Sequence, residues 1–144
     1  MTVADLLRQA RLGLDRLEPE AAADALRSGE LLVDIRPLTQ RLVDGVIPGT
    51  WAIDRNVLEW RLDPTSPHRI EAIDGHDQRV ILICDEGYAS SLAAAVLRLI
   101  GLHRATDVVG GFQSWARRGL PVIPFRAGAH QSPDLDTAPA RRPG

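Results

Sequence analysis

The chemistry of this sequence is concentrated at one cysteine. Cys84 is the only cysteine among the 144 residues, and it directly follows the aliphatic run of residues 80–83. A short loop with one glycine comes next, and residues 89–96 are rich in alanine and leucine. This order predicts a buried strand, a sharp turn and a helix N-terminus. Backbone N–H groups converge at such a place, and they favour a thiolate over the thiol.

Several interpretations of this pattern are open from the residues alone. A cysteine at the end of a buried strand can be chemically inert. A thiolate can instead attack a phosphate ester, with an arginine of the loop holding the phosphoryl oxygens. It can also accept a sulfane sulfur and carry it as a persulfide. Residues 85–91 contain no arginine or lysine, which argues against phosphoryl transfer and favours sulfur transfer.

Composition excludes several other classes of protein. A chain of this length with 44% hydrophobic residues is expected to form one domain with a real core. A net charge of −2 gives no field that would attract nucleic acid or an anionic membrane. No Cys/His spacing resembles a metal site, and we expect neither a metal nor a cofactor. No signal-like or membrane-spanning apolar run is present, and a lone thiol suits a reducing compartment, so we expect a cytoplasmic protein.

Short apolar runs alternate with helical patterns along the chain. A capping box at Thr2 and Asp5 predicts an opening helix. Further helices are expected over residues 18–27, 56–62, 66–72, 89–100 and 112–118, and strands over residues 14–17, 31–37, 51–53, 80–83 and 107–109. This alternation predicts an α/β fold with a mostly parallel sheet and helices on both faces.

Four motifs in order resemble the single-domain rhodaneses. Residues 32–36 resemble the family's strand that ends in Asp-x-Arg, and residues 45–50 its Gly-His-Ile-Pro-Gly-Ala segment, with valine in place of the histidine. Residues 84–91 resemble its Cys-x-x-Gly-x-x-Ser loop, and residues 110–122 its closing signature. The resemblance implies a five-stranded, mostly parallel sheet. We expect an N-terminal helical extension over residues 1–13, a rhodanese-like domain over 14–124 and a disordered tail over 125–144.

The resemblance also implies a reaction. Cys84 would take a sulfane sulfur from thiosulfate or a persulfide donor and pass it to a thiophilic acceptor, such as cyanide or a small thiol. Because the chain has no second cysteine, an external nucleophile must discharge the persulfide. The alternative is a sulfur relay or binding module that serves a partner enzyme and has negligible free turnover.

The expected active loop consists of Cys84 followed by Asp85, Glu86, Gly87, Tyr88, Ala89 and Ser90. Many rhodanese loops carry cations, whereas this loop has two acids and an alanine where arginine is frequent. At ~6 Å each acid opposes a thiolate by roughly 0.7 kcal/mol in water and about 3 kcal/mol at an effective dielectric constant of 20. A helix N-terminus favours the thiolate by roughly 0.3–2 kcal/mol. Our hypothesis is that the acids disfavour dianionic donors such as thiosulfate.

Positive charge near the pocket is expected from outside the loop. Family analogy places the segments of Arg36, Arg55 and Arg61 near its mouth, although a position on the surface away from it is the default for each arginine. Trp60 is a candidate for the pocket wall, with a packing role as the alternative. Tyr88 is expected either to gate access or to cover apolar surface.

Overall fold

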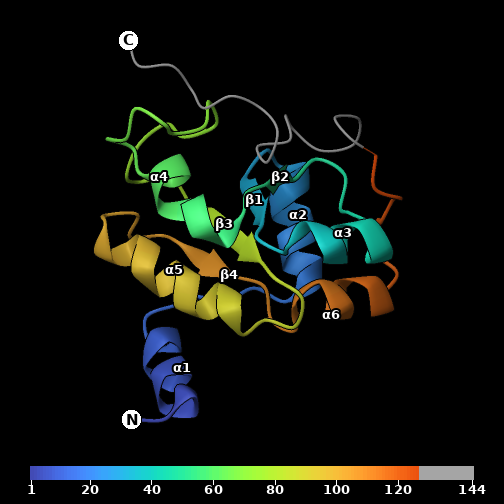
Figure 1. The fold of residues 1–144 in the computed structure, drawn as a ribbon, viewed down its shortest axis with the longest axis horizontal. Helices are drawn as coiled ribbons and strands as arrows, with labels where there is room; N and C mark the ends of the chain where they lie inside the picture. The colour runs from blue at the N-terminus through green and yellow to red at the C-terminus, as the bar shows by residue number, and fades with distance from the viewer. Residues whose placement is uncertain (127–144) are drawn as a thin grey trace.

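The computed structural model describes residues 1–126, which Figure 1 shows in colour. The predicted tail over residues 125–144 therefore lies, apart from its first two residues, outside the described part. No helix within residues 1–126 is long and apolar enough to cross a bilayer. The helices are α1 (Val3–Arg11), α2 (Pro19–Arg27), α3 (Leu38–Asp44), η1 (Arg55–Val57), α4 (Leu58–Leu62), α5 (Ala89–Leu99) and α6 (Gly111–Arg117), and the strands are β1 (Leu31–Asp34), β2 (Trp51–Ala52), β3 (Val80–Ile83) and β4 (Thr106–Asp107).

The strands form one parallel sheet in the order β2-β1-β3-β4. The sheet thus has four strands rather than the expected five. The predicted edge strand over residues 14–17 contributes only a parallel bridge between Leu17 and Val108, beside β4. The ladder cannot continue because Pro19 begins α2 two residues later, and proline has no N–H to donate.

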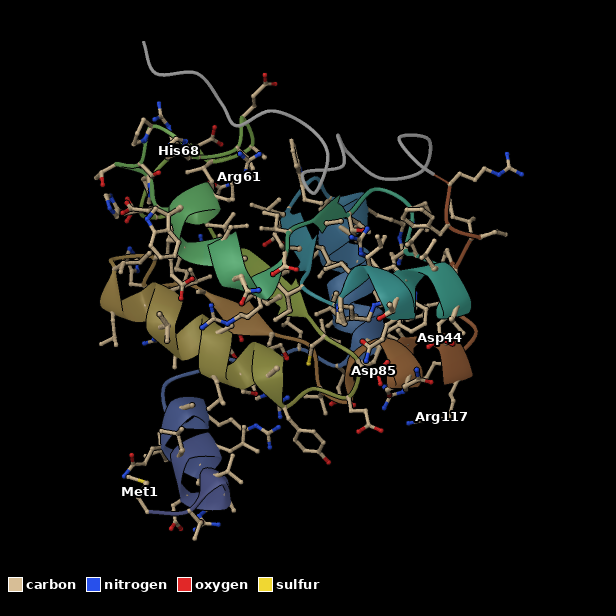
Figure 2. The ribbon with its side chains drawn as sticks, viewed as in Figure 1. Met1, Asp44, Arg61, His68, Asp85 and Arg117 are labelled. Atoms are coloured by element: carbon tan, nitrogen blue, oxygen red, sulfur yellow. The ribbon has the colours of Figure 1, made fainter. Side chains whose placement is uncertain are left out.

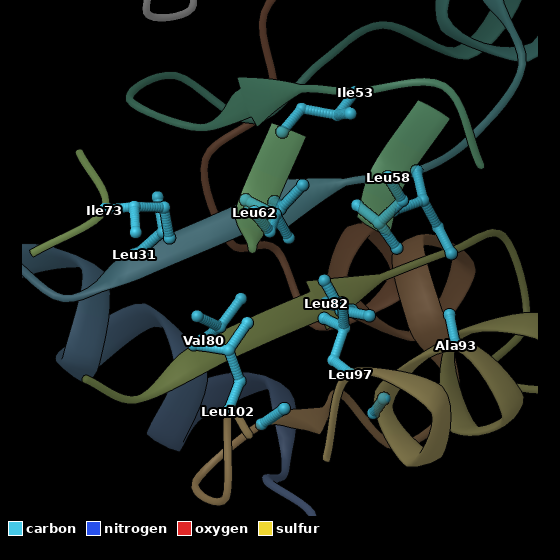
Figure 3. Packing of buried hydrophobic residues seen from close by; sticks show 14 of the residues in the cluster. Leu31, Ile53, Leu58, Leu62, Ile73, Val80, Leu82, Ala93, Leu97 and Leu102 are labelled. Atoms are coloured by element: carbon cyan, nitrogen blue, oxygen red, sulfur yellow. The ribbon is translucent and has the colours of Figure 1, made fainter. Parts of the chain in front are cut away.

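Alternate side chains of the central strands supply two apolar layers. On one face, Leu31, Val80 and Leu82 pack against α4 and α5, as Figure 3 shows. On the other face, Leu32 and Ile81 pack against the alanines of α2 and the aromatic residues of α6. The sheet is therefore covered on both sides, which fixes the direction in which its strand ends deliver the loops.

Two local predictions differ from the structure. Residues 66–72 form turns rather than a helix, because the Ile70 N–H bonds to the Arg61 carbonyl and the Ile70 side chain enters the core. Helix α3 was missed at the sequence level. Its hydrophobic side chains Leu42 and Val43 are exposed, and its one buried residue is Arg41, so it shows no apolar stripe to predict it from.

The start of α6 fixes the start of the cysteine loop. The Phe112 N–H donates to the Cys84 carbonyl at 2.8 Å, and the Gln113 N–H donates to the Asp85 carbonyl at 3.0 Å. Gly111 makes this approach feasible, since a Cβ at this position would lie 2.6 Å from both carbonyl oxygens. Its φ of +61° also lies in the left-handed region, which glycine adopts without strain.

We predict that Gly111→Ala destabilises the protein more than Gly119→Ala. Both glycines have positive φ, so alanine costs about 1–2 kcal/mol at either position. A Cβ at Gly119 meets open space, whereas one at Gly111 forces apart two backbones and adds about 1–3 kcal/mol. Urea unfolding of the two variants measures the difference. Equal losses would show that the contact between α6 and the loop is not tight.

Candidate active site around Cys84

Cys84 lies one residue beyond β3 and lines a cavity of about 400 Å³. The residue is only 6% exposed. One wall of the cavity consists of Asp85, Glu86, Tyr88 and Ala89, and the facing wall comes from residues 35–37, Gln40 and Arg55. The carboxyl ends of β1 and β3 therefore meet at this cavity, as expected for a ligand site in a parallel α/β sheet.

The Cys84 sulfur sits within a ring of hydrogen bonds. The backbone N–H groups of Gly87 and Ser90 donate to Sγ at 3.2 and 3.3 Å, and the thiol donates to Ser90 Oγ at 3.2 Å. Gly87 adopts φ +89°, and Ser90 belongs to the first turn of α5. Two amides that point at one sulfur stabilise negative charge on it, which is the property a nucleophilic sulfur needs.

Behind this ring lies a buried carboxylate that the sequence analysis missed. Asp107 is fully buried, and its Oδ2 accepts hydrogen bonds from Ser90 Oγ and Ser91 Oγ, each at 2.7 Å. Arg16 Nε donates to Asp107 Oδ1, also at 2.7 Å. The signal for this network was an aspartate in a predicted buried strand, because such a charge requires partners.

The two acids of the loop occupy different surroundings. Asp85 is half-buried and lies against α6, as Figure 2 shows, where its Oδ1 accepts from Gln113 Nε2 at 2.9 Å. Glu86 is exposed at the rim of the cavity. Asp85 is thus held in place while Glu86 faces solvent, and both add negative charge near the sulfur.

Two of the candidate arginines line the cavity, and both are paired. Arg36 is buried, makes a bidentate bond to Asp34 with Nη2 at 2.8 Å, and stacks 3.7 Å above the Phe112 ring. Arg36 Nη1 has no hydrogen-bond partner among the described residues. Arg55 Nη1 binds both carboxylate oxygens of Glu59, at 2.8 and 2.9 Å. Most of the positive charge on this wall is therefore already balanced.

The other two pocket candidates lie elsewhere. Neither Trp60 nor Arg61 is among the residues that line the cavity, and Arg61 is well separated from Asp85 in Figure 2. Trp60 is 59% exposed. Burial lowers the pKa of the Arg61 guanidinium below its ordinary value. Tyr88 is exposed and is among the residues that line the cavity.

Comparison with known proteins agrees with this geometry. The family model described as the rhodanese-like domain matches residues 18–118. The chain belongs to this family. The rhodanese-like domain is 30% identical over 112 residues to a sulfurtransferase of Allochromatium vinosum, covering 76% of this chain and 95% of that protein. It is 32% identical over 100 residues to the thiosulfate sulfurtransferase GlpE of Stutzerimonas stutzeri, and the match covers 69% of this chain and 83% of that protein.

A solved structure resembles the whole arrangement. It is a Rhodopseudomonas palustris protein described as being of unknown function and a possible tyrosine phosphatase, with a TM-score of 0.77 and 29% identity. The match covers 85% of this rhodanese-like chain and 95% of that one. Within residues 1–126 no group of three His, Cys, Asp or Glu side chains could hold a metal ion.

We predict that Asp107→Ala destabilises the protein by about 3–5 kcal/mol, because it leaves the largely buried guanidinium of Arg16 without its carboxylate partner. The hydroxyls of Ser90 and Ser91 lose their acceptor as well. Urea unfolding measures the loss. Asp77→Ala is the matched control, because the Asp77 side chain is 98% exposed and its one ion pair within residues 1–126 is with His103. This variant should unfold at the same urea concentration as the wild type. Equal midpoints for the two variants would contradict the role of Asp107.

Proposed function

We propose that the protein is a sulfurtransferase that carries sulfane sulfur as a persulfide on Cys84. The observation that carries this proposal is the Sγ atom of Cys84, which accepts two backbone N–H groups while it lines an accessible cavity. An inert core cysteine would have neither feature. The sulfurtransferase names of the relatives in the same family support the same reaction class.

With thiosulfate as donor, the Cys84 thiolate attacks the outer sulfur and forms a new S–S bond. The bond between that sulfur and the sulfonate sulfur breaks, its electron pair leaves with sulfite, and Cys84 becomes an anionic persulfide. Cyanide or a thiolate then takes the outer sulfur, which gives thiocyanate or a new persulfide and regenerates the Cys84 thiolate. The amides of Gly87 and Ser90 stabilise the Cys84 thiolate that begins the cycle and is regenerated at its end.

The charges around the cavity support a singly charged donor over thiosulfate. Arg36 and Arg55 are each paired with a carboxylate, while Asp85 and Glu86 add two negative charges on the loop side. Positively charged clamps are what a dianion needs in order to bind. A persulfide donor with one negative charge meets less repulsion, and we infer that such a donor is the better substrate.

The same charges argue against phosphoryl transfer, the activity suggested in the description of the Rhodopseudomonas palustris protein. A phosphoryl group in transit needs cations around its oxygens. The loop of this chain has none over residues 85–91. The donors it presents to the cysteine are backbone amides, which suit a sulfur anion.

A relay function is the alternative form of the same chemistry. Because the chain has one cysteine, the persulfide needs an external acceptor, and that acceptor can belong to a partner enzyme. The exposed Tyr88, one of the residues that line the cavity, favours this alternative, since an exposed aromatic side chain suits a protein contact. A reducing compartment such as the cytoplasm would keep Cys84 available between turnovers.

We predict that incubation with a sulfane sulfur donor adds one sulfur atom, about 32 Da, to the intact protein. Cys84→Ala should gain no mass, because no other thiol is present. Intact mass spectrometry measures both. A cyanide-dependent thiocyanate assay then separates free turnover from relay. A wild-type protein that gains no mass from thiosulfate or from any persulfide donor would exclude the proposed reaction.

We predict that Glu86→Gln raises kcat/KM for thiosulfate about threefold to tenfold, since it removes one repulsive charge at the cavity rim. Glu71→Gln is the matched control, because Glu71 is an exposed acid away from the cavity. Higher ionic strength should also raise the wild-type value through screening. A wild-type kcat/KM that falls with added salt would contradict the role of the acidic rim.

A further inference from the structure

The N-terminal segment reaches the back of the cysteine loop. The family model begins its match at residue 18, so α1 and the bridge residues before α2 lie outside it. Two arginines of this segment nevertheless donate to the same backbone atom of the loop. Arg11 Nη2 lies 2.7 Å from the Gly87 carbonyl oxygen, and Arg16 Nη2 lies 3.1 Å from it.

These two bonds hold the carbonyl of Gly87, the residue whose N–H donates to the Cys84 sulfur. Carbonyl and N–H groups of one trans peptide point in opposite directions, and no peptide within residues 1–126 is cis. When the Gly87 carbonyl is held by the arginines, the N–H of Tyr88 must point away from them. The N–H of Gly87 itself stays on Sγ at 3.2 Å. The two arginines and the sulfur are thus bonded to the same loop residue, the arginines through its carbonyl and the sulfur through its N–H.

Arg11 differs from Arg16 in its charge balance. Arg16 is paired with the buried Asp107, so that pair is close to neutral. No ion pair within residues 1–126 includes Arg11, whose contacts are the Gly87 carbonyl, Ser91 Oγ at 3.0 Å and the Tyr88 ring at 5.8 Å. Arg11 therefore places an unbalanced positive charge beneath a loop that carries two acids and no cation of its own.

We propose that Arg11 is a positioning residue of the active site and that α1 supplies the positive charge which the cysteine loop lacks. The charge favours the Cys84 thiolate, and it favours the persulfide in the same way. Only the second effect rests on the proposed function. The first concerns the reactivity of the thiol alone and can be measured without a sulfur donor.

Other charges face Cys84, and a test must hold them constant. Asp85 and Glu86 lie on the loop, the pair of Arg16 and Asp107 lies behind it, and Arg36 and Arg55 lie across the cavity with their carboxylate partners. Variants of Arg11 leave all of these in place. A difference between such variants therefore reports the contribution of Arg11.

The test is the rate at which iodoacetamide alkylates Cys84 in the full chain, measured from pH 5 to pH 10. We expect Arg11→Gln to move the midpoint of this profile upward by about half a unit to one unit, so that alkylation below the midpoint slows about threefold to tenfold. Arg11→Lys keeps the charge and should restore most of the rate. Arg8→Gln removes the same charge from the same helix without touching the loop, and should match the wild type.

Each result decides the proposal. A profile of Arg11→Gln that coincides with that of Arg8→Gln overturns it. A profile of Arg11→Lys as slow as that of Arg11→Gln also overturns the role of the charge. Because α1 contributes no buried residue to the core, these variants should still unfold in one cooperative transition, which checks that the fold is intact. If the alkylation profiles differ as expected but no persulfide forms, the proposed function is rejected and the inference about Arg11 stands.

Discussion

A buried carboxylate must be surrounded by donors, and this constraint organises the site. Asp107 accepts from two serines at the start of α5 and from Arg16, which directly precedes the Leu17 that forms a bridge with Val108. Removing the charged partner of such a buried carboxylate lowers the free energy of unfolding by several kcal/mol. The residues that satisfy Asp107 also fix the helix that points at Cys84. The hydrogen bonds that Asp107 requires therefore also set the geometry around Cys84 at the edge of the sheet.

Opposing electrostatic effects act on the Cys84 sulfur. Two amides and the underlying guanidinium of Arg11 favour negative charge on Sγ, while Asp85 and Glu86 oppose it. The amides contact a buried sulfur and are screened by salt much less than the exposed acid, which acts through solvent. The arrangement can hence stabilise a sulfur anion at the cysteine and still repel a doubly charged ligand that approaches from outside.

Local signals in the sequence predicted the parts of the fold that depend on neighbouring residues. The capping box of Thr2 and Asp5, the strand before Cys84 and the helix after it all follow from chemistry within one or two turns of chain. Helix α3 could not be predicted in this way, because its exposed apolar residues break the helical pattern.

For the candidate site, too, the sequence predicted only what depends on neighbouring residues. The loop and its amides follow from the residues next to Cys84. Arg11, Arg16 and Asp107 meet only because residues more than seventy positions apart pack together, which a single sequence does not encode as a pattern. The same limit explains why Arg61 was expected near the cavity and is buried elsewhere.

The depth of Cys84 has a further consequence for oxidation. A disulfide requires two Cα atoms within about 7 Å of each other. Cys84 is 6% exposed and is reached through a cavity of about 400 Å³ between two walls of the same molecule. Two folded copies cannot bring their cysteines that close without opening those walls. Small sulfur compounds can enter, while cross-linking of the chain to itself through its only thiol is sterically blocked.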